Sequence, residues 1–132
     1  MRIGELARDS GLPIDTIRYY ERLGLLPQPA RAASGYRRYA DADTQRLRFI
    51  RRAKALGFGL AQIAQLLELS AMRGADMADL RERATRTLEA IEARIAELAR
   101  MRDGLRQLVA ACPGHGALAD CPILSALTED LP

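Results

Sequence analysis

The stretch Thr-Ile-Arg-Tyr-Tyr-Glu at residues 16–21 lies in a segment that we expect to form a helix from about Pro13 to Leu23. Pro13 suits the first turn of a helix, and Asp15 favours the positive end of the helix dipole. Gly24 ends the helix, because glycine readily adopts the backbone conformation that closes one. The apolar side chains that we expect to face inward are Ile14, Ile17 and Leu23.

A shorter helix, expected from Ile3 to Ala7 and ended by Gly11, precedes this segment. Two short helices joined by a glycine-containing turn form the helix-turn-helix pattern. The later segment Pro29–Tyr39 contains a Ser-Gly turn followed by Tyr36-Arg37-Arg38-Tyr39, which predicts a small β-hairpin, or wing. The sequence therefore predicts a mainly α fold with an N-terminal winged helix-turn-helix domain over residues 1–70.

Two more helices are expected to complete this domain. The first is capped by Asp41 or Asp43 and reaches about Leu56, and the second runs from Leu60 to Leu69. Their apolar side chains are Leu47, Phe49, Ile50 and Leu56 in the first helix and Ile63, Leu66 and Leu67 in the second.

One long helix is expected over residues 75–111, which contain no proline and a single glycine, Gly104. Apolar side chains recur there at steps of three or four: Leu80, Ala84, Leu88, Ile91, Ile95, Leu98, Met101, Leu105 and Leu108. A helix of about 35 residues is about 50 Å long, too long for so small a chain to cover its stripe. We expect it to pair with its own copy in a homodimeric coiled coil, parallel or antiparallel. The alternative is a helix that folds back on its own domain.

Positive charge gathers at the front of the chain. Residues 1–56 hold 12 Lys/Arg and 6 Asp/Glu, whereas the remaining residues hold 8 and 11. This asymmetry favours a polyanionic partner that contacts only the N-terminal end. Arg18 can bond guanine or phosphate, and the hydroxyls of Tyr19 and Tyr20 can reach phosphate or sugar. The alternative is that both tyrosines pack inside and the arginines are solvated.

No pattern indicates an enzyme. The single histidine, His115, has no acid–base partner at motif spacing, and neither a phosphate-binding loop nor paired carboxylates occur. No apolar run approaches the ~20 residues that span a bilayer, and Met1–Leu12 lacks the apolar core of a signal peptide. We therefore expect a cytoplasmic protein without a membrane segment, in a compartment where thiols stay reduced.

Cys112 and Cys121 are the only cysteines, and they bracket a loop rich in glycine and proline within residues 112–132. Thiolates select soft ions such as Cu(I) and Zn(II). Pro122 is expected to begin a short final helix over Ile123–Leu127, whose positive end would stabilise a thiolate on Cys121. A redox disulfide and two unrelated cysteines are the alternatives to a metal site.

Several strings together resemble the DNA-binding domain of the MerR family of regulators. They are Ile3-Gly4-Glu5-Leu6-Ala7, Gly11-Leu12, Thr16-Ile17-Arg18-Tyr19-Tyr20-Glu21, Gly24-Leu25-Leu26 and Gly35-Tyr36-Arg37-Arg38-Tyr39. The resemblance continues through Leu47, Phe49-Ile50, Ala53, Leu56-Gly57-Phe58 and Ile63, and it covers nearly the whole chain. It implies an antiparallel coiled-coil homodimer that binds double-stranded promoter DNA. It also implies that an effector activates transcription by RNA polymerase, because its binding distorts the promoter.

On this resemblance, the candidate DNA-binding residues belong to the second helix and the wing. They are Thr16, Arg18, Tyr19, Tyr20, Arg31, Tyr36, Arg37 and Arg38.

The stretch from Cys112 to Leu124 resembles the metal-binding loop of the copper-responsive branch, in which two cysteines hold Cu(I), Ag(I) or Au(I). Branches that sense Zn, Cd, Pb or Hg add a third cysteine, and Met77 stands at the corresponding position here. Met77 is therefore either a thioether ligand or apolar lining. His115 could complete a site for Zn(II) or Co(II). A copper sensor has two alternatives. One is a divalent-metal sensor, and the other is a regulator that responds to oxidation or to an organic ligand.

Overall fold

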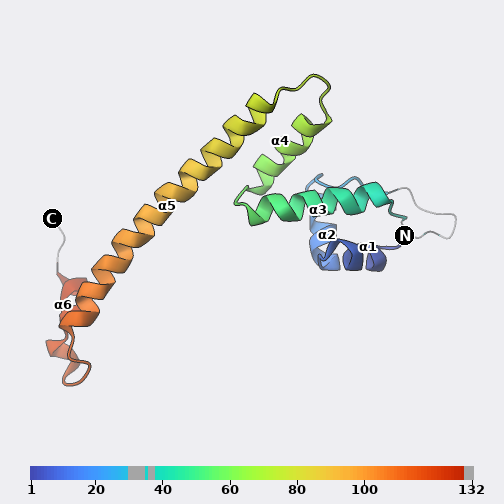
Figure 1. Ribbon diagram of the computed structural model, residues 1–132. Helices are drawn as coiled ribbons and strands as arrows, with labels where there is room; N and C mark the ends of the chain where they lie inside the picture. The colour runs from blue at the N-terminus through green and yellow to red at the C-terminus, as the bar shows by residue number, and fades with distance from the viewer. Residues whose placement is uncertain (30–34, 36–37, 130–132) are drawn as a thin grey trace. The chain divides into compact units, whose positions relative to one another are not determined.

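The computed structural model describes residues 1–29, 35 and 38–129, and all of their regular secondary structure is helical. Figure 1 shows the helices in chain order. They are α1 (Ile3–Ser10), α2 (Ile14–Arg22), α3 (Asp41–Ala55), α4 (Leu60–Ala71), α5 (Met77–Ala111), the 3-10 turn η1 (Leu118–Asp120) and α6 (Pro122–Thr128). The mainly α prediction is confirmed. Most of the predicted wing lies outside the described residues.

The chain forms two compact units, Met1–Ala84 and Thr85–Pro132. In the first unit α1 packs against both α2 and α3, and α3 packs against α4. The side chains that are almost completely buried among these helices are Leu6, Ile17, Leu26, Leu47, Ile50 and Ile63. The unit boundary lies inside α5, and the functional division at residues 70 and 112 stays a prediction.

Three residues predicted to face inward are exposed instead. Ile14 is 37% exposed, Leu23 48% and Leu56 68%, and the last two lie just beyond the ends of α2 and α3. In place of Ile14, α2 buries Tyr20 and Glu21 beside Ile17. The face of α2 that packs inward is therefore shifted toward its C-terminal end.

Three arginines of α3 fasten the helix-turn-helix to the rest of the unit. Arg48 donates to the carbonyl oxygen of Asp9 over 3.1 Å, and Arg51 donates to that of Ser10 over 3.3 Å. These carbonyls lie at the C-terminal end of α1, where a helix leaves acceptors unpaired and its dipole favours cations. Arg46 makes the same kind of bond to the carbonyl of Leu25. These arginines hold the fold together through backbone acceptors.

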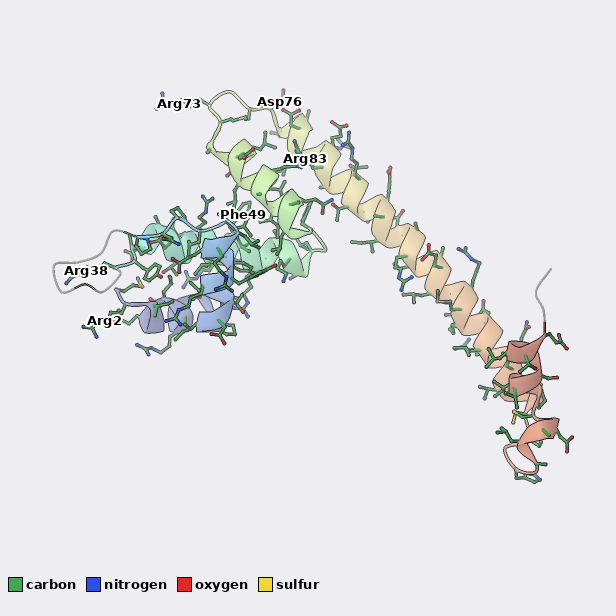
Figure 2. The ribbon with its side chains drawn as sticks, turned by 180° about the vertical axis from the view of Figure 1, so that it is seen from behind. Arg2, Arg38, Phe49, Arg73, Asp76 and Arg83 are labelled. Carbon is green, nitrogen blue, oxygen red and sulfur yellow. The ribbon has the colours of Figure 1, made fainter. Side chains whose placement is uncertain are left out.

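Helix α5 runs through Gly104 without interruption over 35 residues. Near its start Arg83 donates to the side-chain oxygen of Gln65 on α4 over 2.7 Å (Figure 2). Farther along, most side chains of the predicted apolar stripe are exposed on the single chain, from 38% at Ile91 to 60% at Ile95 and Leu105, and Leu108 is half-buried. The stripe therefore remains available to a second helix, as expected of a coiled-coil dimer. Among the described residues no helix has the length and apolar character needed to cross a membrane.

Replacing Gly11 with alanine is expected to destabilise the N-terminal unit by two separate effects. Gly11 ends α1 with φ +73°, and a Cβ there would collide with the guanidinium of Arg51. Left-handed backbone costs an ordinary residue about 1–2 kcal/mol, and moving the flexible end of Arg51 aside gives up its hydrogen bond to the carbonyl of Ser10, which adds about 0.5–1.5 kcal/mol. Denaturant unfolding monitored by circular dichroism measures the loss.

Gly24→Ala is the matched control for Gly11→Ala. Gly24 has a similar φ of +78°, but no atom lies within 4 Å of its added Cβ. The control should lose only the backbone contribution of about 1–2 kcal/mol. Equal losses in the two variants would show that Arg51 moves aside without cost.

Candidate functional site

Helix α2 presents one face to the core and another to solvent. Tyr20 is only 2% exposed and belongs to the hydrophobic core, whereas Tyr19 is 44% exposed. Arg18 is exposed and Thr16 is half-buried. The structure therefore gives Tyr20 a packing role, and of the two tyrosines predicted to contact DNA from α2 only Tyr19 reaches the surface. Arg22 lies over the ring of Tyr19, 5.8 Å from its centre, so these two exposed side chains support one another.

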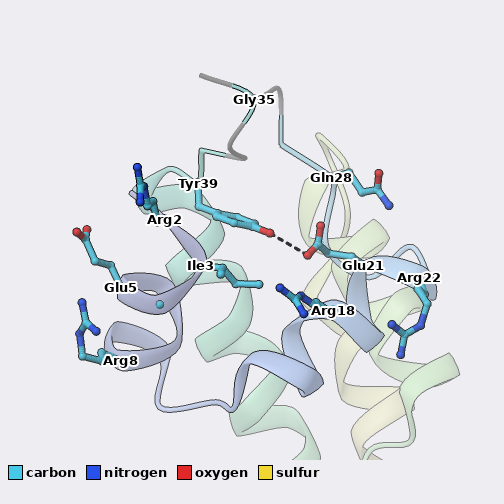
Figure 3. A pocket seen from close by; sticks show the side chains of 11 residues that line it. Arg2, Ile3, Glu5, Arg8, Arg18, Glu21, Arg22, Gln28, Gly35 and Tyr39 are labelled. Atoms are coloured by element: carbon cyan, nitrogen blue, oxygen red, sulfur yellow. Dashed lines mark hydrogen bonds between the residues drawn. The ribbon is translucent and has the colours of Figure 1, made fainter. Parts of the chain in front are cut away.

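A groove of about 870 Å³ opens between α1 and α2 (Figure 3). The charged side chains that line it are Arg2, Glu5, Arg8, Arg18, Glu21 and Arg22. The carboxylate of Glu21, a residue only 6% exposed, accepts a 2.9 Å hydrogen bond from the hydroxyl of Tyr39. This bond lies within the groove and ties the end of α2 to the chain just before α3.

Tyr39 also binds the N-terminal segment through its backbone. Its N–H donates to the carbonyl of Met1 over 2.7 Å, and its carbonyl accepts from the Met1 amine over 2.8 Å. Arg38, next to it, is exposed (Figure 2). The other predicted wing contacts, Arg31, Tyr36 and Arg37, lie outside the described residues.

Glu21 was not among the site residues predicted from the sequence, although its spacing carried a signal. Glu21 stands four residues after the buried Ile17, which places both on one face of α2. A carboxylate on a buried face needs a hydrogen-bond donor, and Tyr39 supplies one. The spacing could therefore have indicated that the Glu21 carboxylate needs a hydrogen-bond donor, but not that Tyr39 supplies it.

The second candidate site is the loop between α5 and α6, which brings the two cysteines together. Cys112 directly follows α5, and Cys121 directly precedes α6. The loop reverses through Gly114 and Gly116, whose φ values of +83° and +111° favour glycine. Both cysteines are partly buried and carry free thiols.

The surroundings of Cys121 favour its thiolate. A hydrogen bond from the backbone N–H of Leu124 lowers the pKa of Cys121 below the usual range for a cysteine. Partial burial opposes this effect, while the N–H of Ile123 and the thiol of Cys112 lower the pKa further. Since the thiolate is the form of cysteine that binds metals, the lowered pKa prepares Cys121 to act as a metal ligand.

The other predicted ligands, His115 and Met77, are both exposed. His115 is exposed, and its Nδ1 lies 3.1 Å from the carbonyl oxygen of Pro113. Met77, at the start of α5, is 86% exposed. Within the described part of the chain, no three side chains of His, Cys, Asp or Glu form a cluster that could hold a metal ion. The chain by itself therefore offers two sulfur ligands in one place.

A helix-turn-helix with a basic groove, joined to a long helix with an uncovered apolar stripe, defines a DNA-binding regulator that works as a dimer. A family model described as MerR HTH family regulatory protein matches residues 1–70, and one described as MerR, DNA binding matches residues 44–108. The chain belongs to the MerR family. This membership shows that the chain is a transcription regulator and not an enzyme. It also confirms the predicted partners, which are double-stranded DNA and a second copy of the chain.

Known relatives match along nearly the full length. The HTH-type transcriptional regulator HmrR of Rhizobium leguminosarum is 44% identical over 129 residues, which cover 98% of each chain. Among solved structures, PbrR691 of Ralstonia metallidurans in complex with lead(II) is 33% identical, with a TM-score of 0.86 over 96% of this chain and 98% of its own. MerR of Bacillus megaterium in complex with mercury(II) is 36% identical, with a TM-score of 0.74 over 98% of this chain and 100% of its own. The ions in both structures are divalent, and neither relative is named for copper.

The pKa of Cys121 is testable by alkylation. In Cys112→Ala the N–H groups of Ile123 and Leu124 remain, so Cys121 should react as a thiolate at lower pH than an ordinary cysteine. The wild-type thiol pair should shift the midpoint lower still, because the thiol of Cys112 also lowers the pKa of Cys121. The pH dependence of the rate with iodoacetamide measures both midpoints.

The control for this measurement is the Cys112→Ala variant unfolded in urea, in which the amides at the start of α6 no longer meet the sulfur. Its midpoint should return to that of a free cysteine, about 8.5. If folded and unfolded variants share one midpoint, the hydrogen bonds from α6 do not stabilise the thiolate.

Proposed function

We propose that this chain is a metal-responsive transcription regulator that binds promoter DNA as a homodimer and senses a thiophilic ion through Cys112 and Cys121. The observation that carries the proposal is the thiol pair, in which the N–H groups of Leu124 and Ile123 and the neighbouring thiol of Cys112 lower the pKa of Cys121. Two neighbouring sulfurs can share one soft ion, and a pair prepared in this way competes well against protons.

A divalent soft ion is the better-supported effector. The relatives of known structure hold lead(II) and mercury(II), and they match this chain over nearly its full length. Two thiolates neutralise one divalent charge, which suits a half-buried site. His115 lies in the same loop and could supply an imidazole to Zn(II) or Co(II) after turning away from Pro113.

A monovalent ion, Cu(I), Ag(I) or Au(I), is the second candidate. One observation favours it: the sequence holds two cysteines and no third, and two soft ligands suffice for these ions. Met77 could contribute a thioether only if it were covered, because it is 86% exposed on the single chain. We assign Met77 no ligand role in the divalent proposal.

The DNA-binding part of the proposal rests on the exposed face of α2. Arg18, Tyr19 and Thr16 would contact the DNA, and Arg31, Tyr36, Arg37 and Arg38 would contact the flanking backbone. Ion binding would change the shape of the promoter that RNA polymerase meets, a deformation of about 1–6 kcal/mol. Helix α5 continues without a break from Met77 to Ala111, next to Cys112, and therefore connects the two functions along the chain. We place the protein in the cytoplasm, where thiols stay reduced beside DNA.

Titration of the thiol-reduced protein with Hg(II), Pb(II), Zn(II) and Cu(I), each in an affinity buffer, tests the sensing site. Ultraviolet thiolate–metal bands should saturate at one ion per cysteine pair, with the tightest ion identifying the effector. Cys112→Ser and Cys121→Ser should each lose the band and the transcriptional response. Operator affinity should change less than about twofold, because both cysteines lie in one compact unit and α2 lies in the other.

Two results would contradict metal sensing. One is a wild-type protein that saturates no thiolate–metal band with any of the four ions. The other is a response to oxidant alone that both serine variants lose, which would identify a disulfide switch.

Arg18→Ala should weaken operator binding by roughly 1–3 kcal/mol, because Arg18 is exposed on α2 and aims into the groove. Fluorescence anisotropy with a labelled operator duplex measures the change. Arg94→Ala is the control, since Arg94 pairs with Glu97 at 2.9 Å on the surface of α5. Unchanged affinity of Arg18→Ala would remove Arg18 from the DNA interface.

A further inference from the structure

We propose that Arg8 of α1 and Arg22 of α2 bind the phosphate backbone of promoter DNA from two sides of the groove. Neither residue belongs to the contacts expected from the sequence. The inference rests on the proposed DNA-binding role of the exposed α2 face and extends that surface onto α1.

The groove gathers four guanidinium groups from two segments (Figure 3). Arg2 and Arg8 come from α1 and the residue before it, and Arg18 and Arg22 come from α2. All four side chains are exposed. Like charges gathered on one concave surface repel one another, and the repulsion is relieved when an anion enters.

The arginines of this unit divide into two groups by their partners. Arg46, Arg48 and Arg51 each donate to a backbone carbonyl and hold the helices together. Arg8 and Arg18, by contrast, make no hydrogen bond or ion pair with any residue in the described ranges 1–29, 35 and 38–129. Arg22 meets only the face of Tyr19, which leaves its five N–H donors unused within those ranges. The donors of Arg8 and Arg22 therefore remain available to a ligand.

The two carboxylates in the groove do not cancel this charge. Glu21 is nearly buried and accepts the hydroxyl of Tyr39. Glu5 is exposed on α1 between Arg2 and Arg8. Four guanidiniums and two carboxylates leave a formal charge of +2, which suits the phosphodiester groups of one DNA strand.

Duplex DNA is the occupant that the surrounding surface favours. Arg22 follows Arg18 by one helical turn, so both lie on the same side of α2 as the proposed DNA contacts. In a helix-turn-helix protein the first helix crosses the DNA backbone while the second enters the major groove. A cavity of about 870 Å³ is also large enough for a sugar-phosphate segment.

The test measures the affinity of the full-length, metal-free protein for an operator duplex and for a scrambled duplex over a range of NaCl concentrations. Arg8→Ala and Arg22→Ala should each weaken both duplexes about three- to tenfold. Each should also reduce the slope of log affinity against log salt by about 0.9, because one counterion fewer is released. Arg8→Lys and Arg22→Lys should keep the wild-type slope, since the charge remains.

Two controls separate this inference from other causes. Arg48→Ala removes an arginine that bonds the carbonyl of Asp9, and it should lower the melting temperature without changing the salt slope. Wild-type slopes in both Arg8→Ala and Arg22→Ala would overturn the inference. The proposed metal sensing would be untouched by that result, because it is measured by thiolate–metal bands and by the response of the wild-type protein to metal.

Discussion

The uncovered apolar stripe of α5 is the constraint on which the rest of this structure depends. Along this 35-residue helix, most leucine, isoleucine and methionine side chains of the stripe stay 38–60% exposed within the described part of the chain. Burying such a side chain fully contributes about 1.5–3 kcal/mol, so a second copy of the helix is a strong partner. The same helix begins in the helix-turn-helix unit and ends beside Cys112. Dimerisation therefore orders the element that links the DNA-binding surface to the thiol pair.

Much of the fold follows from helical periodicity. The wrong predictions show where periodicity no longer distinguishes buried from exposed residues. The helices were expected at their observed places, because glycine and proline mark their ends and apolar residues recur at helical spacing. In the nine-residue α2, however, both Ile14 and Tyr20 lie one turn from Ile17, and hydrophobicity favours Ile14. The structure buries Tyr20, because the chain returns at Leu25 and Leu26 to pack at that end. The path of the chain after the helix decided between two positions that helical spacing makes equivalent.

The sequence predicts which types of residue make up the candidate sites. It does not predict the hydrogen bonds that these residues form. The spacing of the cysteines indicated a loop with two sulfurs, but the hydrogen bonds from Ile123 and Leu124 depend on how α6 begins. Likewise, the 12 basic residues among residues 1–56 indicated an anionic partner without distinguishing structural arginines from available ones. That distinction required the carbonyls of Asp9, Ser10 and Leu25, which the packing of α1 against α3 and the path of the chain after α2 bring within reach. A count of charges therefore predicts the partner better than it predicts the contacts.

Cys121 and the start of α6 form the most specific feature of the proposed metal site. The N–H groups of Leu124 and Ile123 hydrogen-bond the sulfur of Cys121, and together with the thiol of Cys112 they lower its pKa in spite of partial burial. A lower pKa means that less free energy is spent on releasing the Cys121 proton when an ion binds. Because the loop already holds the sulfur of Cys121 near Cys112, less of the binding free energy of an ion would also be spent on ordering the loop.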